Sequence, residues 1–345
     1  MSIESLFAEA FAAHQKGDLG KAERGYRGLI RSKPLEAQHN LGLVLGQAGR
    51  FAEAEAAFRT ALVARDNARS RYALADLVLA DGRYSQGWPL WEARRDLPEL
   101  RIPTLEAPYP EWRGEDLGGK RLLVLAEQGL GDSIMYARYF APLRARGAQI
   151  VFFCPPELHR LMARLGVEVA GAGDEADART IAADYWVLTG SLPLRLASTL
   201  ETVPPPAAFA GLPHGSGGGI GLVARGAPLH RNDHNRSLPP RLAQRLLKLG
   251  RDLTPEATGA KDFDDTARIV AGLDLVIAVD TSVAHLAGSM GKPVWVLLPA
   301  RDTDWRWLRR REDSPWYPSA RLFRQRVSGD WEPVLRRVEA ALANR

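Results

Sequence analysis

The sequence predicts an α + α/β protein in which helical repeats come first and two α/β lobes follow. A glycine-centred pattern recurs three times before residue 95, at intervals of 32 and 33 residues. From residue 121 onward, short apolar runs alternate with helical stretches, as expected for parallel sheets covered by helices. The proline- and glycine-rich stretch 96–120 predicts a linker or a packed extended segment, and 206–218 predicts a second linker. We therefore expect repeats over 1–95, a first lobe over 121–205 and a second lobe over 219–345.

Composition and charge are those of an ordinary globular protein. Apolar residues make up 46% of the chain and charged residues 25%. No apolar run approaches the roughly 18 residues that cross a bilayer, so we expect no transmembrane segment. The N-terminal residues lack the basic start and apolar core of a signal peptide, which favours the cytoplasm. Cys154, the single cysteine, is predicted to be a small core residue.

The net charge is +5, and the densest basic cluster is RWLRRRED at 306–313. Acidic residues are scattered through the same stretch, so we expect no nucleic-acid partner. A pocket for phosphate groups fits this cluster better, because arginine holds phosphate oxygens with two parallel hydrogen bonds.

The repeated pattern combines a glycine, a small residue five positions later and an aromatic residue nine positions later. The glycines are Gly17, Gly49 and Gly82, the small residues are Ala22, Ala54 and Gly87, and the aromatics are Tyr26, Phe58 and Trp91. We expect the glycine to make the turn between two helices, the small residue to let them approach, and the aromatic to fill the gap against the next unit. Pro89 inside the third unit predicts a capping repeat.

These three units resemble the tetratricopeptide repeat, a helix-turn-helix unit of about 34 residues. Two roles stay open for them. They form a stable helical cap on the rest of the chain, or they form a groove that docks a peptide or a protein partner.

Each lobe is predicted from strands that alternate with helices, which is a Rossmann-like arrangement. In the first lobe we expect strands at 121–126, 149–154, 167–171 and 184–190, and helices at 133–147 and 191–198. In the second lobe we expect strands at 220–224, 274–280 and 293–299, and helices at 239–249, 264–273, 282–290 and 331–345. Ligands of such sheets bind outside the carboxyl ends of the strands, so we expect the site in a cleft between the lobes.

The stretch AVDTSVAHLAG, residues 278–288, places polar residues at such a strand end. Asp280 ends an apolar strand, and Thr281 or Ser282 is expected to cap the next helix. At 100° per residue, His285 falls opposite the apolar stripe of that helix, so we expect it outside the core. Two hydroxyls, backbone N–H groups and an imidazole at a helix N-terminus predict a phosphate or diphosphate site.

Other interpretations of this turn are weaker. Three residues from one tight turn could hardly line up as a hydrolase triad. No second histidine or cysteine lies within ligand spacing, so we expect no metal. A capped helix with an exposed histidine stays open as a purely structural alternative.

Two further elements accompany the turn Asp-Thr-[Ser/Gly]-x-x-His-Leu at 280–286. Gly131-Asp132 follows the first strand within EQGLGD, and Arg236 precedes a proline-started helix. Together the three elements resemble the GT-B glycosyltransferases, in particular the heptosyltransferase-like type (glycosyltransferase family 9-like). The resemblance covers roughly residues 110–343, and DSPWYPSARLFRQ, at 313–325, looks typical of bacterial glycosyltransferases fused to repeats.

The resemblance implies a metal-independent, inverting transfer of a sugar from a nucleotide-sugar donor to a protein or glycan acceptor. Asp132 would be the catalytic base, with N-capping of its own helix as the structural alternative. The nucleotide-sugar is the donor substrate, and no cofactor is implied. The donor diphosphate would be held by Arg236, Asp280, Thr281, Ser282 and His285.

Two further points keep alternatives open. Gly129 and Gly131 also begin a dinucleotide fingerprint, but its third glycine is missing. The segment 251–262 has almost no apolar run for a further strand that the resembled family carries there. A non-catalytic repeat adaptor with a degenerate glycosyltransferase lobe is therefore the second hypothesis for the whole chain.

Overall fold

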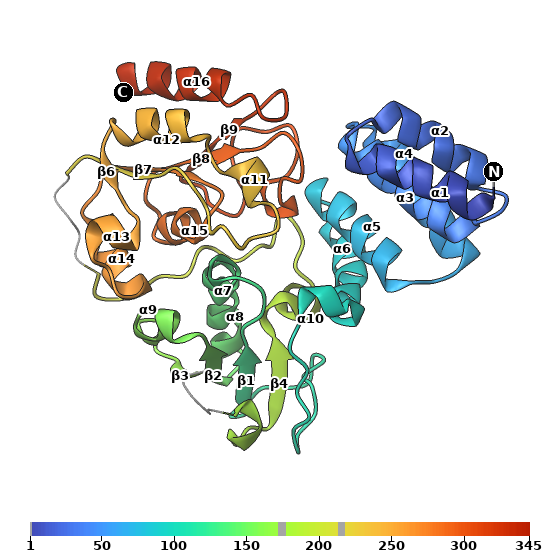
Figure 1. Ribbon diagram of the computed structural model, residues 1–345. Coiled ribbons are helices and arrows are strands. Elements are labelled where there is room, and N and C mark those ends of the chain that lie inside the picture. The colour runs from blue at the N-terminus through green and yellow to red at the C-terminus, as the bar shows by residue number, and fades with distance from the viewer. Residues whose placement is uncertain (1, 172–176, 213–217) are drawn as a thin grey trace. The chain divides into compact units, whose positions relative to one another are not determined.

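The computed structural model describes residues 2–171, 177–212 and 218–345 (Figure 1). They divide into two compact units. The helical unit contains the chain up to Ile102 together with Asp304–Arg309, and the α/β unit contains Pro103–Thr303 and Arg310–Arg345. The chain therefore passes from one unit to the other three times. Among the described residues, no helix is both long and apolar enough to cross a membrane.

The helical unit is built from pairs of helices joined by short turns, as the repeated pattern predicts. The pairs are α1 Ile3–Gln15 with α2 Leu19–Leu29, α3 Pro34–Gln47 with α4 Phe51–Ala64, and α5 Ala68–Ala80 with α6 Tyr84–Trp91. Two 3₁₀ segments follow, η1 Glu92–Asp96 and η2 Pro98–Leu100.

The expected roles of the glycines and the small residues are confirmed. Gly17, Gly49 and Gly82 have φ angles of 77°, 75° and 76°, a left-handed conformation that glycine adopts without strain. At Gly87, an added Cβ would lie 2.5 Å from a methyl carbon of Leu79, so α5 and α6 could not approach so closely with a larger residue.

The repeated aromatics make ring contacts inside their own helical pair, which the predicted packing against the next unit did not include. Each faces a ring on the first helix of its pair. The ring centroids lie 5.7 Å apart for Phe7 and Tyr26, 5.7 Å for His39 and Phe58, and 5.2 Å for Tyr72 and Trp91. The partner rings are also 32 and 33 residues apart, so they are a repeated position that the sequence analysis missed.

Ion pairs recur between successive helical pairs. Arg50, before α4, binds Glu23 of α2 at 2.7 Å, and Arg83, before α6, binds Glu55 of α4 at 2.5 Å. All four side chains are partly exposed, so each pair stabilises the stacking only modestly.

A segment from far along the chain covers the last helical pair. Trp305, in η7 Trp305–Trp307, packs edge-on against Trp88 at 5.2 Å and Trp91 at 5.7 Å between ring centroids. Arg309 donates its backbone N–H to the Ala80 carbonyl at 3.1 Å. The segment therefore shields an apolar face on which a further repeat would otherwise stack.

Acidic side chains pair with three arginines of the basic cluster 306–313, for which the sequence predicted a phosphate pocket. The Arg309 guanidinium binds the Asp81 carboxylate at 2.5 Å, and that of Arg306 lies 3.1 Å from Asp304. Arg311 binds Asp313 at 2.6 Å. These arginines are used in contacts inside the protein, because acidic partners lie close enough to neutralise them.

The first lobe of the α/β unit contains a parallel sheet in the order β3-β2-β1-β4. Its strands are β1 Arg121–Leu125, β2 Gln149–Cys154, β3 Glu168–Gly171 and β4 Tyr185–Leu188. Its helices are α7 Leu130–Tyr136, α8 Phe140–Ala145, α9 His159–Ala163 and α10 Leu192–Arg195. The helix expected at 133–147 is thus two α-helices with a 3₁₀ turn, Ala137–Tyr139, between them. Cys154 is buried, as predicted.

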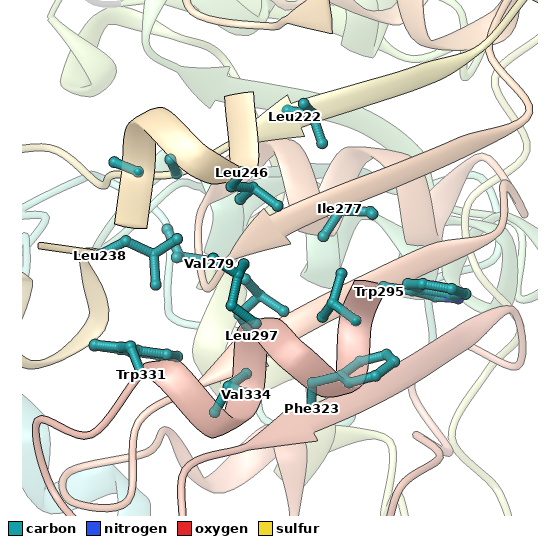
Figure 2. Close-up of a cluster of buried hydrophobic side chains, with 14 of the residues drawn as sticks. Leu222, Leu238, Leu246, Ile277, Val279, Trp295, Leu297, Phe323, Trp331 and Val334 are labelled. Carbon is teal, nitrogen blue, oxygen red and sulfur yellow. The ribbon is translucent and has the colours of Figure 1, made fainter. Parts of the chain in front are cut away.

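The second lobe contains a parallel sheet in the order β6-β5-β7-β8-β9. Its strands are β5 Ile220–Val223, β6 Arg251–Asp252, β7 Leu275–Val279, β8 Val294–Leu298 and β9 Ala320–Arg324. Its helices are α11 Asp233–Arg236, α12 Pro240–Leu247, α13 Pro255–Thr258, α14 Phe263–Ala271, α15 Ser282–Ser289 and α16 Glu332–Ala343. Figure 2 shows its core, where Val279 and Leu297 of the central strands face Trp331 and Val334 near the start of α16.

Two strands of this sheet differ from the expectation. The segment 251–262 does form a strand, β6, although it is only two residues long. Backbone pairing forms this strand without an apolar run. Just after β6, Leu253 donates its N–H to the Leu222 carbonyl at 3.0 Å, and its side chain is buried. The edge strand β9 was not expected. It lies in the stretch 313–325, which was noted only for its resemblance to bacterial glycosyltransferases fused to repeats.

The two predicted linkers are both fixed in part. Trp112 is buried and donates its N–H to the Trp186 carbonyl at 2.7 Å, so the chain after Pro103 packs on the first lobe. In the second linker, residues 213–217 lie outside the described residues. Before them, Ala207 is buried and the Pro204 carbonyl accepts a hydrogen bond from Arg138 at 3.2 Å.

Candidate functional site

The candidate site begins at the carboxyl end of β7, the central strand of the second sheet. All five residues of β7 are buried, and Asp280 follows them directly. Thr281 occupies the N-cap position of α15 with extended backbone angles, φ −144° and ψ 169°. The sequence therefore places a polar turn where a fully apolar strand must leave the sheet and enter a helix.

The expected side-chain cap is not formed. Thr281 makes no hydrogen bond from its side chain to the first turn of α15. Its Oγ1 atom is buried, and no partner for it occurs among the described residues. A buried hydroxyl without a partner is costly, so this atom is well suited to bind a ligand atom.

His285 is buried, with 3% of its surface exposed, which corrects the expectation that it lies outside the core. The periodicity identified the face of α15 that packs on the sheet, but α15 also packs against α7 of the first lobe. At Gly131, in the first turn of α7, an added Cβ would lie 2.7 Å from His285 Cδ2 and 3.2 Å from Ser282 Cα. Glycine at position 131 thus permits this close approach of the two lobes.

Polar groups lie near both ring nitrogens of His285, and one of them is within hydrogen-bond distance. Its Nδ1 atom lies 2.9 Å from the Tyr317 hydroxyl, and its Nε2 atom lies 3.6 Å from Asp280 Oδ1. Tyr317 is buried. The sequence analysis missed Tyr317, although it lies in the stretch 313–325 that was singled out by resemblance.

Asp132 is placed beside this helix contact because it follows Gly131. Its carboxylate accepts the Gly129 N–H at 2.9 Å, and Gly129 is the N-cap of α7. Asp132 is therefore the third residue of the helix, in a capping-box arrangement, rather than the N-cap that we considered. Its side chain is partly exposed.

Arg236 reaches the same turn from α11. It donates from Nη1 to the Asp280 carbonyl at 2.9 Å, and its Nε lies 3.3 Å from Asp233 Oδ1. At Gly226, after β5, an added Cβ would lie 2.6 Å from Arg236 Nε. The absence of a side chain at Gly226 thus makes room for the guanidinium.

His230 is a further titratable residue within electrostatic range of the candidate site, and the sequence analysis missed it. It lies in the loop after β5, and its Nδ1 accepts the Asn232 N–H at 3.1 Å. Partial burial of its ring and the positive charge of Arg236 lower the pKa of His230. The carboxylates of Asp280 and Asp132 act in the opposite direction, so His230 lies within the field of both. Two histidines, His230 and His234, in a stretch that also contains glycine and proline gave no signal of this position.

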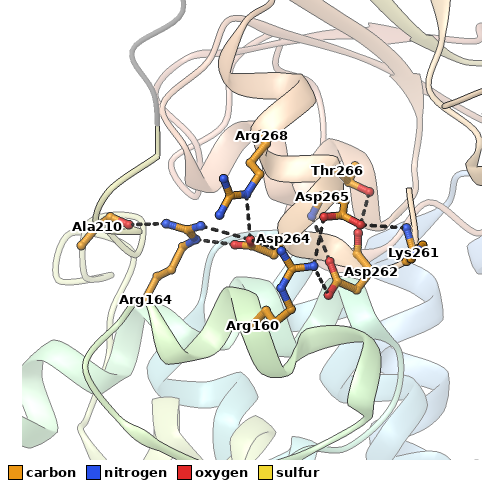
Figure 3. Close-up of polar contacts among 9 residues, drawn as sticks. All are labelled: Arg160, Arg164, Ala210, Lys261, Asp262, Asp264, Asp265, Thr266 and Arg268. Atoms are coloured by element: carbon orange, nitrogen blue, oxygen red, sulfur yellow. Dashed lines mark hydrogen bonds and ion pairs between the residues drawn. The ribbon is translucent and has the colours of Figure 1, made fainter. Parts of the chain in front are cut away.

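Charged side chains join the lobes at a second place, where α9 meets the start of α14 (Figure 3). Arg160 lies 2.9 Å from Asp262 and 3.0 Å from Asp265. Arg164 binds Asp264, which is only 1% exposed. The Arg164 guanidinium lowers the pKa of the Asp264 carboxyl group, against the opposing effect of burial.

A third contact between the lobes lies next to the site. Arg138, in the turn between α7 and α8, is buried and donates from Nη2 to the Trp316 carbonyl at 2.7 Å. Its guanidinium carbon lies 4.8 Å from the Trp316 ring centroid and 5.1 Å from that of Tyr317. The first lobe therefore touches Tyr317 as well as His285.

The arrangement combines groups that favour an anion with a carboxylate beside them. The first turn of α15, Arg236 and the buried His285 present positive charge or hydrogen-bond donors. Asp132 supplies a carboxylate from the other lobe that can accept a proton. Among the described residues, no group of three or more potential metal-ligating side chains was found.

No model of a protein family matches this chain. Protein FlbA of Caulobacter vibrioides is 30% identical to it over 350 residues, which cover 85% of this chain and 58% of FlbA. The chain thus spans less than two thirds of the length of this relative.

Solved structures with weak likeness include two glycosyltransferases. The glycosyl transferase family 9 structure from Veillonella parvula has 13% identity and a TM-score of 0.47, over 67% of this chain and 100% of that chain. The ADP-heptose lps heptosyltransferase II of E. coli has 15% identity and a TM-score of 0.45, over 65% of this chain and 99% of that chain. Likeness at this level assigns neither an activity nor a site residue.

Proposed function

We propose that this chain is a GT-B glycosyltransferase of the heptosyltransferase-like type. It moves a sugar from a nucleotide-sugar donor to a protein or glycan acceptor, with inversion and without a metal ion. The observation that carries the proposal is the contact of α7 with α15 at Gly131 and His285. This contact brings the first turn of α7, which carries Asp132, against the start of α15, and the N-terminus of that helix is suited to a diphosphate.

The donor diphosphate binds at the first turn of α15. The helix N-terminus and Arg236 balance its negative charge, and the Thr281 hydroxyl and His285 supply further hydrogen bonds. Asp280 orients His285 through its carboxylate and Arg236 through its backbone carbonyl. Ser282 begins the helix and contributes its backbone N–H. These groups stabilise the charge that develops on the leaving diphosphate, so the proposal requires no metal ion.

Asp132 is the base in this proposal. The acceptor hydroxyl oxygen attacks the anomeric carbon, its proton passes to the Asp132 carboxylate, and the bond from that carbon to the diphosphate oxygen breaks. A single displacement of this kind inverts the configuration at the anomeric carbon. The hydrogen bond from the Gly129 N–H holds the carboxylate in place.

The helical unit is proposed to be a set of tetratricopeptide repeats that positions the acceptor or a protein partner, in the cytoplasm. The left-handed turn glycines and the ring pairs at intervals of 32 and 33 residues support this assignment. The alternative is a non-catalytic adaptor, favoured by the two-residue length of β6.

Calorimetric titration of the whole chain with UDP, GDP, ADP and dTDP tests the donor site first. We expect one of these to bind saturably and to lose affinity by about tenfold or more in His285→Ala, since a buried polar contact is lost. His39→Ala is the matched control, because it removes a hydrogen-bonded histidine from the helical unit. Binding of none of the four to the folded protein would favour the adaptor.

Asp132→Asn then separates binding from transfer. It keeps the shape of the side chain but removes the proton acceptor. We expect nucleotide affinity to stay within about threefold while transfer of sugar from the matching nucleotide-sugar falls by about a hundredfold or more. Unchanged turnover would remove Asp132 as the base.

A further inference from the structure

Tyr317 contacts the candidate donor site through His285. It lies in the loop between β8 and β9, and its ring rests on α15 at Gly288. An added Cβ at Gly288 would lie 2.5 Å from the Tyr317 ring, so glycine is needed for this contact. The hydroxyl reaches His285 Nδ1 at 2.9 Å.

The chemistry of the two neighbours of His285 decides which ring nitrogen carries the proton. The Asp280 carboxylate only accepts hydrogen bonds, and it lies on the Nε2 side of the ring. A proton on Nε2 makes the position of the Asp280 carboxylate on that side of the ring favourable. The Tyr317 hydroxyl can either donate or accept, so it donates to the lone pair on Nδ1.

We propose that Tyr317 is a positioning residue of the donor site, which favours, in the neutral form of the His285 ring, the tautomer protonated on Nε2 and thereby presents that N–H to a diphosphate oxygen. This role rests on the proposed function. A proton on Nδ1 instead would leave a lone pair on Nε2, directed at both the Asp280 carboxylate and the anionic ligand, and that arrangement is repulsive.

Three contacts hold the imidazole in one orientation. Tyr317 lies at Nδ1, Asp280 at Nε2, and Gly131 against the Cδ2 edge. Arg138 of the first lobe in turn lies over the ring of Tyr317. The donor N–H of His285 therefore depends on residues of both lobes, which links the assembly of the lobes to the geometry of the donor site.

Nitrogen NMR of the protein labelled with ¹⁵N-histidine tests the tautomer directly. The shifts of the two ring nitrogens and their couplings to the carbon-bound protons distinguish Nε2–H from Nδ1–H. We expect His285, assigned by its loss in His285→Gln, to be the Nε2–H form near pH 8. In Tyr317→Phe we expect a mixture of forms and a loss of nucleotide affinity of roughly threefold to tenfold.

Tyr139→Phe is the matched control. The Tyr139 hydroxyl is also buried and bonds to Ser198 Oγ at 2.9 Å, but it does not touch His285. We expect this variant to lose a comparable amount of stability while keeping the tautomer and the nucleotide affinity of the parent protein.

Three outcomes overturn the proposal. An Nδ1–H form in the parent protein, or an unchanged tautomer in Tyr317→Phe with nucleotide binding intact, overturns the role of Tyr317 alone. If the tautomer shifts as expected but the parent protein binds none of UDP, GDP, ADP and dTDP, the proposed function fails and the role at a donor site fails with it.

Discussion

The helical unit and the α/β unit join their parts with different kinds of contact. Successive helical pairs are linked by partly exposed ion pairs that recur along the chain, such as that between Arg83 and Glu55. The two lobes of the α/β unit are linked by a buried carboxylate, Asp264, and by a close approach at Gly131. The ion pairs between helical pairs recur at equivalent positions, whereas each of the lobe contacts described above uses a different set of residues.

This difference predicts which of the two units loses more stability when a single contact is removed. A repeated, partly solvated ion pair contributes little by itself, and its neighbours remain when it is lost. A buried charge pair leaves an unsolvated partner behind when one member is removed. The α/β unit therefore depends on a few residues at the lobe interface, and some of these border the candidate site.

The largest effect is expected from Asp264→Asn. This change leaves Arg164 beside a buried amide, and it should lower the free energy of unfolding by about 2–4 kcal/mol. Urea unfolding followed by tryptophan fluorescence measures it. Asp177→Asn, which breaks an exposed pair with Arg179, is the control and should leave the transition unchanged. Equal shifts for the two variants would contradict the comparison.

The same aspartate predicts a dependence of stability on pH. The pKa of Asp264 is lowered in the folded protein, so its ionised form stabilises the fold at pH values above its unfolded pKa of about 3.9. That contribution is lost as the pH falls through the lowered folded value. Asp264→Asn should therefore lose less stability than the parent protein when both are acidified below about pH 4. If the free energies of unfolding of the two proteins fell in parallel over this range, the stabilising role of the ionised Asp264 would be contradicted.

A smaller effect is expected from Gly131→Ala. The new methyl group meets the His285 ring and the backbone of Ser282, so we expect a loss of about 1–3 kcal/mol and weaker nucleotide binding. Gly28→Ala in α2 is the contrasting variant, because its Cβ meets nothing within 4 Å. It should stabilise the helical unit by up to about 1 kcal/mol. Melting curves of both variants check the opposite signs.

The smallest effect is expected from Arg83→Gln. The ion pair with Glu55 is partly exposed and one of a repeated set, so its loss should cost less than about 1 kcal/mol. The thermal midpoint should move little, and high salt should remove even that difference. A loss as large as that of Asp264→Asn would mean that stacking of the helical pairs also depends on single contacts.

Local patterns predicted much of the fold and the polar turn at which the candidate site begins. The turn glycines, the small residues at helix crossings and the strand–turn–helix around Asp280 follow from spacing within a few residues or one repeat. The two parallel sheets followed from short apolar runs. The residues carrying these features contact near neighbours in the sequence, so the information is present locally.

What the sequence did not predict comes from contacts between distant segments. His285 is buried because α7 covers the face of α15 that the periodicity marked as polar. Tyr317 lies 32 residues from His285, and Arg164 lies 100 residues from Asp264, without any period that links them. The edge strands β6 and β9 are too short or too irregular for a pattern of alternation.

The segment Asp304–Arg309 is synthesised long after the helical pairs that it covers. Trp88 and Trp91 of α6 leave the ribosome more than 200 residues before Trp305, which covers them. At about 5–20 residues per second, this apolar surface stays uncovered for roughly ten to forty seconds. The nascent helical pairs therefore carry a hydrophobic surface accessible to chaperones until the ribosome has translated most of the α/β unit.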